Sequence, residues 1–232
     1  MPNPQPIEWN FKDLVLTDIK KNGGWVNAHA HIDRAFTIRP DSLDIYKKYM
    51  LTEKWDIVDA VKNASEDEYY RRISKALELM INQGVTAVGS FIDVDPVAED
   101  RAIKAALRAK EQYKSQITVK LINQTLKGVI EPKARKWFDI GAEMVDIIGG
   151  LPKRDERDSG KGEEHFDVLL STAKKLGKMV HIHVDQFNVQ SDKETEMLAN
   201  KTIEHGMQGK VVAIHSISLA CQPKEYREMV YK

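Results

Sequence analysis

Short apolar runs and longer amphipathic segments alternate along this chain. The apolar runs predict buried strands, and the segments between them space their apolar residues as one face of a helix does. In residues 66–84, Ile73, Leu77 and Met80 fall on one stripe, and Gly84 follows as a helix stop. The predicted strands are 23–29, 85–94, 117–126, 145–150, 179–186 and 210–220, and the predicted helices are 66–84, 97–113, 131–143, 163–177, 191–206 and one that begins at 223.

This order of elements predicts an α/β fold in which a parallel sheet is covered by helices. Six β/α units fit a (β/α)8 TIM-barrel type of fold that is incomplete, because strands seven and eight are missing. We expect residues 1–22 to be an N-terminal extension and residues 23–232 to be the partial barrel. Polar residues gather at the C-terminal ends of the predicted strands, which is where such folds place their sites.

Two local features qualify this scheme. Residues 37–64 are too long for an ordinary strand-to-helix connection, so we expect a helical lid with Trp55 and Tyr49 near the mouth of the barrel. Packing against the barrel rim is the favoured alternative role for both aromatic rings. Ser191 is predicted to cap the helix over 191–206, with Glu194 completing a capping box.

Composition excludes several classes of partner and location. Among the 232 residues, 35 basic side chains balance 35 acidic ones, and neither sign forms a long block. We therefore expect no nucleic-acid partner and no membrane-surface partner. No apolar run is long enough to span a membrane, and the first residues lack the layout of a secretory signal. With Cys221 as the single cysteine, a cytoplasmic protein is expected.

The seven histidines are unevenly placed. His165 and His205 lie in predicted amphipathic helices and are expected at the surface. The other five lie in predicted strands, and side chains two residues apart on a strand share a face. Taken alone, each could be a histidine of a half-buried strand, but three strand ends with an inward imidazole favour a metal site. These five are His29, His31, His181, His183 and His215.

Imidazole ligands suit several metal ions, among them zinc, iron, nickel and copper. A catalytic site of this kind leaves one position open for water, and the ion lowers the pKa of that water toward neutrality. We expect a nearby histidine or carboxylate to handle protons.

Three motifs, "GGWVNAHAHIDRAF", "VHIHVDQFN" and "VVAIHSISLA", resemble the amidohydrolase superfamily in its cytosine deaminase-like branch. The resemblance covers residues 23–232 and implies that His29, His31 and His183 bind one divalent metal ion, zinc or iron. It also implies a small-molecule substrate. It further implies that His215 contacts the hydrolytic water or the substrate, and that Gln124 contacts the substrate ring. The alternative for Gln124 is an ordinary amide at the end of a strand.

The chain departs from the family pattern at three points. Gln186 stands where the branch has a proton-transferring glutamate, and a neutral amide cannot protonate a ring. Asp185, Glu194 and Glu196 are weak substitutes, because strand parity and helix placement do not favour them. Phe91 stands where these deaminases usually have a histidine, although Asp93 keeps the matching acid. The aspartate that ends strand eight in the family, its usual base, falls outside this sequence.

The expected function is metal-dependent hydrolysis of carbon–nitrogen bonds by a deaminase, an amidase or a cyclic amidohydrolase. His215, Gln186 and Asp185 are the candidate catalytic residues, and Gln124 and Trp55 are the candidate substrate contacts. The alternative is an inactive fragment or a metal-binding pseudoenzyme. A phosphoesterase of the polymerase-and-histidinol-phosphatase type fits the motifs less well. A fragment is favoured over a short form closed by dimerisation, and a homo-oligomer is the open possibility.

Overall fold

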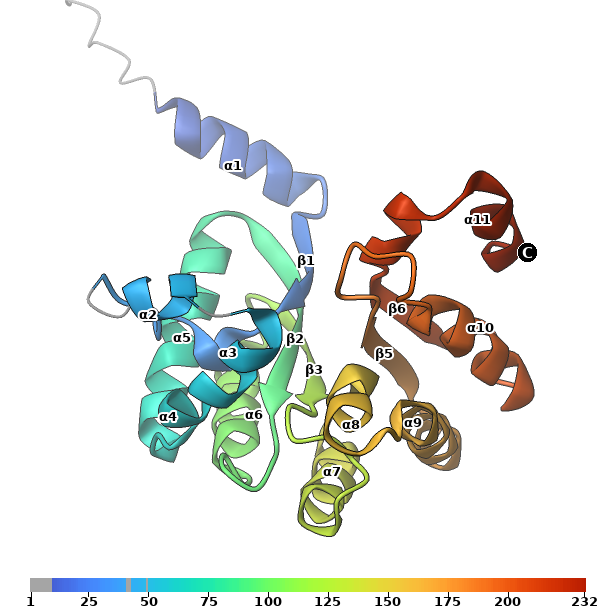
Figure 1. Cartoon of the computed structure of the whole chain (residues 1–232). Coiled ribbons are helices and arrows are strands. Elements are labelled where there is room, and N and C mark those ends of the chain that lie inside the picture. Colours follow the sequence, from blue (N-terminus) through green and yellow to red (C-terminus); the bar gives the residue numbers. More distant parts are fainter. Residues whose placement is uncertain (1–9, 41–42, 49) are drawn as a thin grey trace, which may run out of the picture.

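A computed structural model of the chain describes residues 10–40, 43–48 and 50–232. Its centre is one sheet of six parallel strands whose spatial order is their order along the chain, so that β1 and β6 are its two edges (Figure 1). The strands are β1 (Trp25–Ala30), β2 (Val85–Asp93), β3 (Thr118–Gln124), β4 (Ile147–Gly150), β5 (Met179–Val184) and β6 (Val211–His215). The six strands form a half-barrel, which confirms the predicted incomplete TIM barrel.

Helices connect successive strands on the outside of this arc (Figure 1). They are α5 (Glu66–Asn82), α6 (Arg101–Tyr113), α7 (Pro132–Met144), α8 (Pro152–Ser159), α9 (Gly162–Leu176) and α10 (Glu194–Glu204), with α11 (Lys224–Val230) after the last strand. Directly after β1 comes η1 (Ile32–Arg34), and the lid region that follows holds three short helices, α2 (Leu43–Lys48), α3 (Leu51–Ile57) and α4 (Asp59–Lys62). Tyr49 lies outside the described residues.

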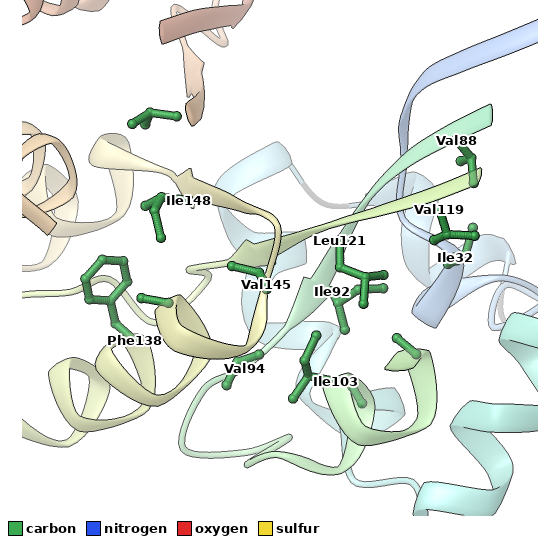
Figure 2. Packing of buried hydrophobic residues seen from close by; sticks show 14 of the residues in the cluster. Ile32, Val88, Ile92, Val94, Ile103, Val119, Leu121, Phe138, Val145 and Ile148 are labelled. Atoms are coloured by element: carbon green, nitrogen blue, oxygen red, sulfur yellow. The ribbon is translucent and has the colours of Figure 1, made fainter. Parts of the chain in front are cut away.

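The main core lies between the outer face of the sheet and the helices, and Figure 2 shows its central part. Strands β2, β3 and β5 contribute alternate residues to it, and α6 and α7 close it from outside. Burial of such side chains is the main driving force of folding. The core includes Val88, Ile92, Val119, Leu121, Val180, Ile182, Ile103 and Phe138. The residues between these positions therefore face the concave side of the half-barrel.

One glycine allows the concave side to be filled tightly. A Cβ on Gly149 in β4 would lie 2.0 Å from the Asn123 carbonyl oxygen and 2.9 Å from the Phe91 ring. Any larger residue would therefore push β3 or Phe91 away. Because Phe91 packs beside the histidines, this glycine keeps the base of the candidate site in place.

Element ends differ from the prediction in ways that the structure explains. The helix predicted from residue 97 begins only at Arg101, because Asp95 accepts hydrogen bonds from the Val97 and Ala98 amides and holds a turn there. The strand predicted to reach 220 ends at His215, where φ is 76°, and a 3-10 helix, η2 (Ile217–Cys221), follows. The capping box at Ser191 is wrong, because α10 begins at Glu194 after Lys193.

Helix α1 (Phe11–Lys21) occupies most of the described part of the predicted extension. It buries no side chain, and it projects away from the half-barrel in Figure 1. The division of the chain into an extension and a barrel stays a prediction. Within the described residues, no helix is both long and apolar enough to cross a lipid bilayer.

Candidate metal centre and active site

Four imidazoles meet at the C-terminal ends of β1, β5 and β6. The ring centroid of His29 lies 5.1 Å from those of His31 and His183, and 5.6 Å from that of His215. His183 and His215 are 5.2 Å apart between centroids. Strand alternation and the parallel order of the sheet thus bring together side chains that are distant in sequence. His29 and His215 are more than 180 residues apart.

The nitrogen donors fit one metal ion. One ring nitrogen from each of His29, His183 and His215 lies within 4.8 Å of the others, so small side-chain rotations would bring all three onto a single ion. The Nδ1 atoms of His29 and His31 are buried and have no hydrogen-bond partner. Buried polar atoms are normally paired, so unpaired imidazole nitrogens here favour a ligand that supplies the missing partner.

His183 is oriented by the backbone of the neighbouring strand. Its Nδ1 lies 3.3 Å from the Gly150 carbonyl oxygen, which can only accept, so Nδ1 carries the proton. The Nε2 lone pair of His183 is then left free. This is the arrangement in which a metal-binding histidine is commonly held.

Burial keeps these imidazoles neutral, which is the form that binds metal. Desolvation lowers the pKa of His31 to about 3, with Arg34 and His29 adding to the effect. Desolvation and the other imidazoles likewise hold the pKa of His183 well below its ordinary value. The pKa values of His29 and His215 are lowered mainly by burial as well.

A cavity of about 490 Å³ opens above the histidines. Its polar lining includes Gln124, Gln186, Lys54 and Arg34, and no carboxylate of a described residue lines it. The side-chain oxygens of Gln124 and Gln186 are buried without a hydrogen-bond partner, so both oxygens are free to accept a hydrogen bond from a substrate. The apolar lining is Ile38, Trp55, Val58, Leu126, Leu151 and Ile217.

Two aromatic rings lie at the candidate site: Trp55 lines the cavity, and Phe91 packs against the histidines. Trp55 is 6% exposed and packs on Leu126 and Leu151, so it both lines the cavity and holds the lid on the rim. The Phe91 centroid lies 4.3 Å from that of His183 and 5.2 Å from that of His29. An apolar ring therefore occupies a position beside the histidines at which the family resemblance led us to look for another imidazole.

Asp185 does not line the cavity. Its backbone has φ of 49°, which breaks the strand alternation that the sequence led us to expect beyond His183. The carboxylate instead accepts hydrogen bonds from the Glu194 amide at 2.7 Å and the Thr195 hydroxyl at 2.6 Å. The structure therefore places Asp185 where it caps α10 and positions the neighbouring Gln186.

A second buried cluster supports the same loop. Glu194 accepts a hydrogen bond from the Asp185 amide at 3.0 Å, and Lys153 lies 3.3 Å from Glu194 and 2.7 Å from Asp192. Burial raises the pKa of Glu194 to about 7; Asp192 adds to this rise, whereas Lys153 opposes it. Lys153 belongs to the first turn of α8, so the ion pairs tie α8 to the loop that carries Gln186.

This raised pKa predicts a pH-dependent stability. The folded protein holds the Glu194 proton up to about pH 7, whereas the unfolded chain releases it near the ordinary pKa of 4.5. The folded state thus binds more protons between these values, and the free energy of unfolding due to Glu194 falls as pH rises through this window. The free energy of unfolding can be measured with urea at about pH 5 and at about pH 8. We expect its decrease between these two pH values to be smaller for Glu194→Gln than for the wild type. A Glu163→Gln control, at a side chain that is 65% exposed, should follow the wild type; equal slopes for all three proteins would contradict the prediction.

The prediction for His165 is wrong, because the side chain is completely buried. Its Nε2 accepts a hydrogen bond from the Leu151 amide at 3.1 Å, and its Nδ1 donates to Asp155 at 2.6 Å. Asp155 also accepts from the Val129 amide at 2.8 Å. The pair therefore fixes two cavity loops, and the only sequence signal for it was the ten-residue spacing between Asp155 and His165.

His205 is half-buried at the end of α10, where its Nε2 lies 2.8 Å from an Asp167 oxygen. The surface position expected for it is therefore only partly observed. The contact ties α10 to α9, outside the cavity.

Sequence analysis also missed a buried ion network at the ends of β1 and β2. Arg34 donates to Asp93 through Nε at 2.7 Å and through Nη2, and Asp93 is completely buried. The Lys62 ammonium, from α4, pairs with Asp95 and lies 3.1 Å from Asp59. These charges join the lid to the strand ends beside the cavity. The acids were visible in the sequence, but nothing there indicated that Lys62 would be buried with them.

The sequence of the chain is similar to those of two known proteins. The chain is 61% identical over 224 residues to a Haemophilus influenzae protein described only as uncharacterized, and it covers 81% of that protein. It is 28% identical over 231 residues to the N-isopropylammelide isopropyl amidohydrolase of Pseudomonas sp. strain ADP, of which it covers 56%. No family model matches the chain.

Two solved structures share its fold. The 5-methylcytosine deaminase of Klebsiella pneumoniae superposes with a TM-score of 0.77 at 21% identity, over 90% of this chain and 50% of that one. The N-isopropylammelide isopropylaminohydrolase of Burkholderia multivorans gives a TM-score of 0.70 at 21% identity, over 89% and 52%. The chain thus spans about half the length of these two enzymes and of the Pseudomonas protein.

Proposed function

This chain belongs to the same family as the Haemophilus influenzae protein, and it resembles the cytosine deaminase-like branch of the amidohydrolase superfamily in sequence and fold. From this premise we propose that it is a metal-dependent hydrolase of carbon–nitrogen bonds in a small nitrogenous compound. The relatives with named activities are a deaminase and two hydrolases of N-isopropylammelide, which supports that reaction class.

The observation that carries the proposal is the meeting of four neutral imidazoles at the floor of the cavity. Nitrogens of His29, His183 and His215 lie within 4.8 Å of one another, and His31 lies beside them. The chemistry of this donor set suits one Zn or Fe ion held by His29, His31 and His183, with His215 adjacent or ligating. When bound, such an ion lowers the pKa of water and so supplies a nucleophile near neutral pH.

The chain's own residues would then bind and orient the substrate. The free amides of Gln124 and Gln186 are placed to hydrogen-bond the carbonyl and amine groups of a small nitrogenous compound. His215 lies at the cavity edge, where its neutral imidazole can accept or donate a proton at the reacting atoms. Trp55, Leu126 and Leu151 exclude water from one side of the cavity.

The lining favours hydrolysis of an amide-type bond over deamination of a ring that must first be protonated. Gln186 is neutral at all ordinary pH values and cannot transfer a proton to a ring nitrogen. Asp185, the nearest carboxylate in sequence, is committed to Glu194 and Thr195. An amide-type substrate needs its leaving nitrogen protonated only after attack, and an imidazole can supply that proton.

The test is to load the purified chain with Zn or Fe and to measure ammonia or amine release from cyclic amides, linear amides and aminopyrimidines. Release from an amide class that requires the metal is the expected result. A protein that binds metal but releases nothing from any class would instead support the metal-binding pseudoenzyme.

Replacing Gln186 by glutamate tests the role assigned to this position. The carboxylate would enter the cavity near the histidines and supply the proton transfer that the amide cannot, so we expect cytosine deaminase activity to appear or to rise by about 100-fold. The measurement is the rate of ammonia release from cytosine at saturating metal.

The matched control is Gln190→Glu, an exposed position on the same loop, which should leave the rate unchanged. If Gln186→Glu binds metal as the wild type does and stays inactive on cytosine, the deaminase interpretation of this cavity is wrong.

A further inference from the structure

A second cavity, of about 650 Å³, lies between α5 and the two ends of the lid. One wall is a face of α5, and the opposite wall is the segment 36–39 that follows η1. Residues 60–64, at the end of the lid, complete the lining. None of the histidines lines this cavity, so it is distinct from the candidate metal centre.

The charge of this cavity is strongly one-sided. From α5 it is lined by Glu68, Arg71, Arg72 and Lys75, which follow the i, i+3, i+4, i+7 spacing of a single helix face. Arg39 adds a fourth cation from the opposite wall. Among the described residues of the lining, Glu68 is the single acidic one, and its carboxylate is 4.0 Å from Arg72. The described lining thus holds four cationic side chains and one carboxylate, in a protein whose overall charge is zero.

Two of these cations have no carboxylate partner among the described residues. Arg71 forms no ion pair there, and the Lys75 ammonium lies over the ring of Phe36, 4.6 Å from its centroid. Phe36 is 45% exposed and has φ of 60°, a conformation that is unfavourable for a bulky side chain. This backbone conformation accompanies placement of the ring against the lysine, and such unfavourable positions cluster at binding sites.

Like charges four residues apart on a helix repel each other, so Arg71 and Lys75 destabilise α5 unless an anion lies between them. A concave surface lined by one sign of charge also concentrates counter-ions. Arginine guanidinium groups match the oxygen geometry of phosphate, and lysine adds a point charge. We propose that this cavity binds the phosphate group of a soluble small molecule.

The proposed phosphate site and the candidate active site share parts of their walls. The segment 36–39 lines both cavities, with Ile38 on the histidine side and Phe36, Thr37 and Arg39 on the basic side. The lid does the same, because Val58 lines the histidine cavity and Val61 lines the basic one. A phosphate held between α5 and Arg39 would therefore contact a wall that the two cavities share.

Isothermal titration of the full chain with inorganic pyrophosphate tests the proposal without any need for metal or activity. The double variant Arg71→Gln/Lys75→Gln removes the two cations that lack a carboxylate partner and leaves Arg72, which packs on Tyr69, in place. We expect its affinity for pyrophosphate to be at least about tenfold weaker than that of the wild type, and wild-type binding to weaken with added salt.

The matched control is Lys175→Gln/Lys210→Gln, which removes two exposed lysines elsewhere and should bind as the wild type does. Succinate, a dicarboxylate, should bind much more weakly than pyrophosphate. The proposal is overturned if the wild type shows no saturable binding, if both double variants lose affinity equally, or if succinate binds as tightly as pyrophosphate. Circular dichroism of each variant checks that it is folded, so that a loss of pyrophosphate binding is not caused by unfolding.

Discussion

Replacing His29 by alanine is expected to abolish metal binding. His29 lies at the centre of the imidazole group, with three other histidine rings within 5.6 Å between centroids. Changes to residues that merely support a metal ligand already cost about 10- to 100-fold in affinity, so loss of a ligand should cost at least about 100-fold. Elemental analysis after loading with Zn and desalting should fall from about one ion per chain to nearly none.

The control for this experiment is His205→Ala, because His205 is bound to Asp167 at the end of α10 and does not line the cavity. Its metal content should equal that of the wild type. Equal metal in the wild type and in His29→Ala would contradict the proposed site, and so would a wild-type chain that retains no ion at all.

Two further variants separate the possible ligand sets. The family resemblance assigns His31 as a ligand and His215 as a water or substrate contact. Geometry instead groups the nitrogens of His29, His183 and His215. If His31→Ala loses the ion and His215→Ala keeps it, the family assignment holds for this chain. The opposite result would show that His215 is the third ligand.

The second large effect is expected from Asp93→Asn, which should lower the free energy of unfolding by about 3–5 kcal/mol. Burial alone would raise the pKa of Asp93, but Arg34 and Lys62 outweigh it and hold this pKa below its ordinary value. The carboxylate is therefore charged when folded, and its removal leaves Arg34 and Lys62 in the interior with less compensation. Urea unfolding at about pH 7 measures the change.

An exposed ion pair provides the comparison. Asp67 lies 3.1 Å from Arg108, but the side chains are 80% and 52% exposed, so Asp67→Asn should cost only about 0–1 kcal/mol. Similar losses for Asp93→Asn and Asp67→Asn would show that the Arg34–Asp93 pair does not support the strand ends. Loss of the pair should also loosen the lid, because Lys62 connects α4 to the same charges.

The order and type of the main elements could be predicted because each depends on local periodicity. Core positions such as Ile73 and Leu77 repeat at helical spacing within one segment, and both are completely buried. The ends of elements depended on single hydrogen bonds instead. Hydrogen bonds to Asp95 hold a turn that makes α6 begin later than predicted, and β6 ends at His215, where φ is 76°. A periodic pattern reveals neither feature.

The candidate site divides in the same way. His29, His31, His183 and His215 could be expected to converge, since parallel strands present their C-terminal ends at one edge of the sheet. Asp185 could not be placed, because its backbone leaves the strand conformation directly after Val184. The burial of His165 was missed, because its partners are Asp155 in α8 and Leu151 directly before it, and the apolar pattern did not reveal this helix.

By itself, the sequence determined the six alternating units, the parallel sheet and the strands that carry the histidines, because these follow from which residues must leave water along each segment. Only the tertiary structure decided which charges and imidazoles meet. It buried Asp93 with Arg34 and Lys62, turned Asp185 toward α10, and faced Arg39 toward the cationic side of α5. Contacts of this kind join segments distant along the chain, and their energies depend on distance and burial, which no linear pattern records.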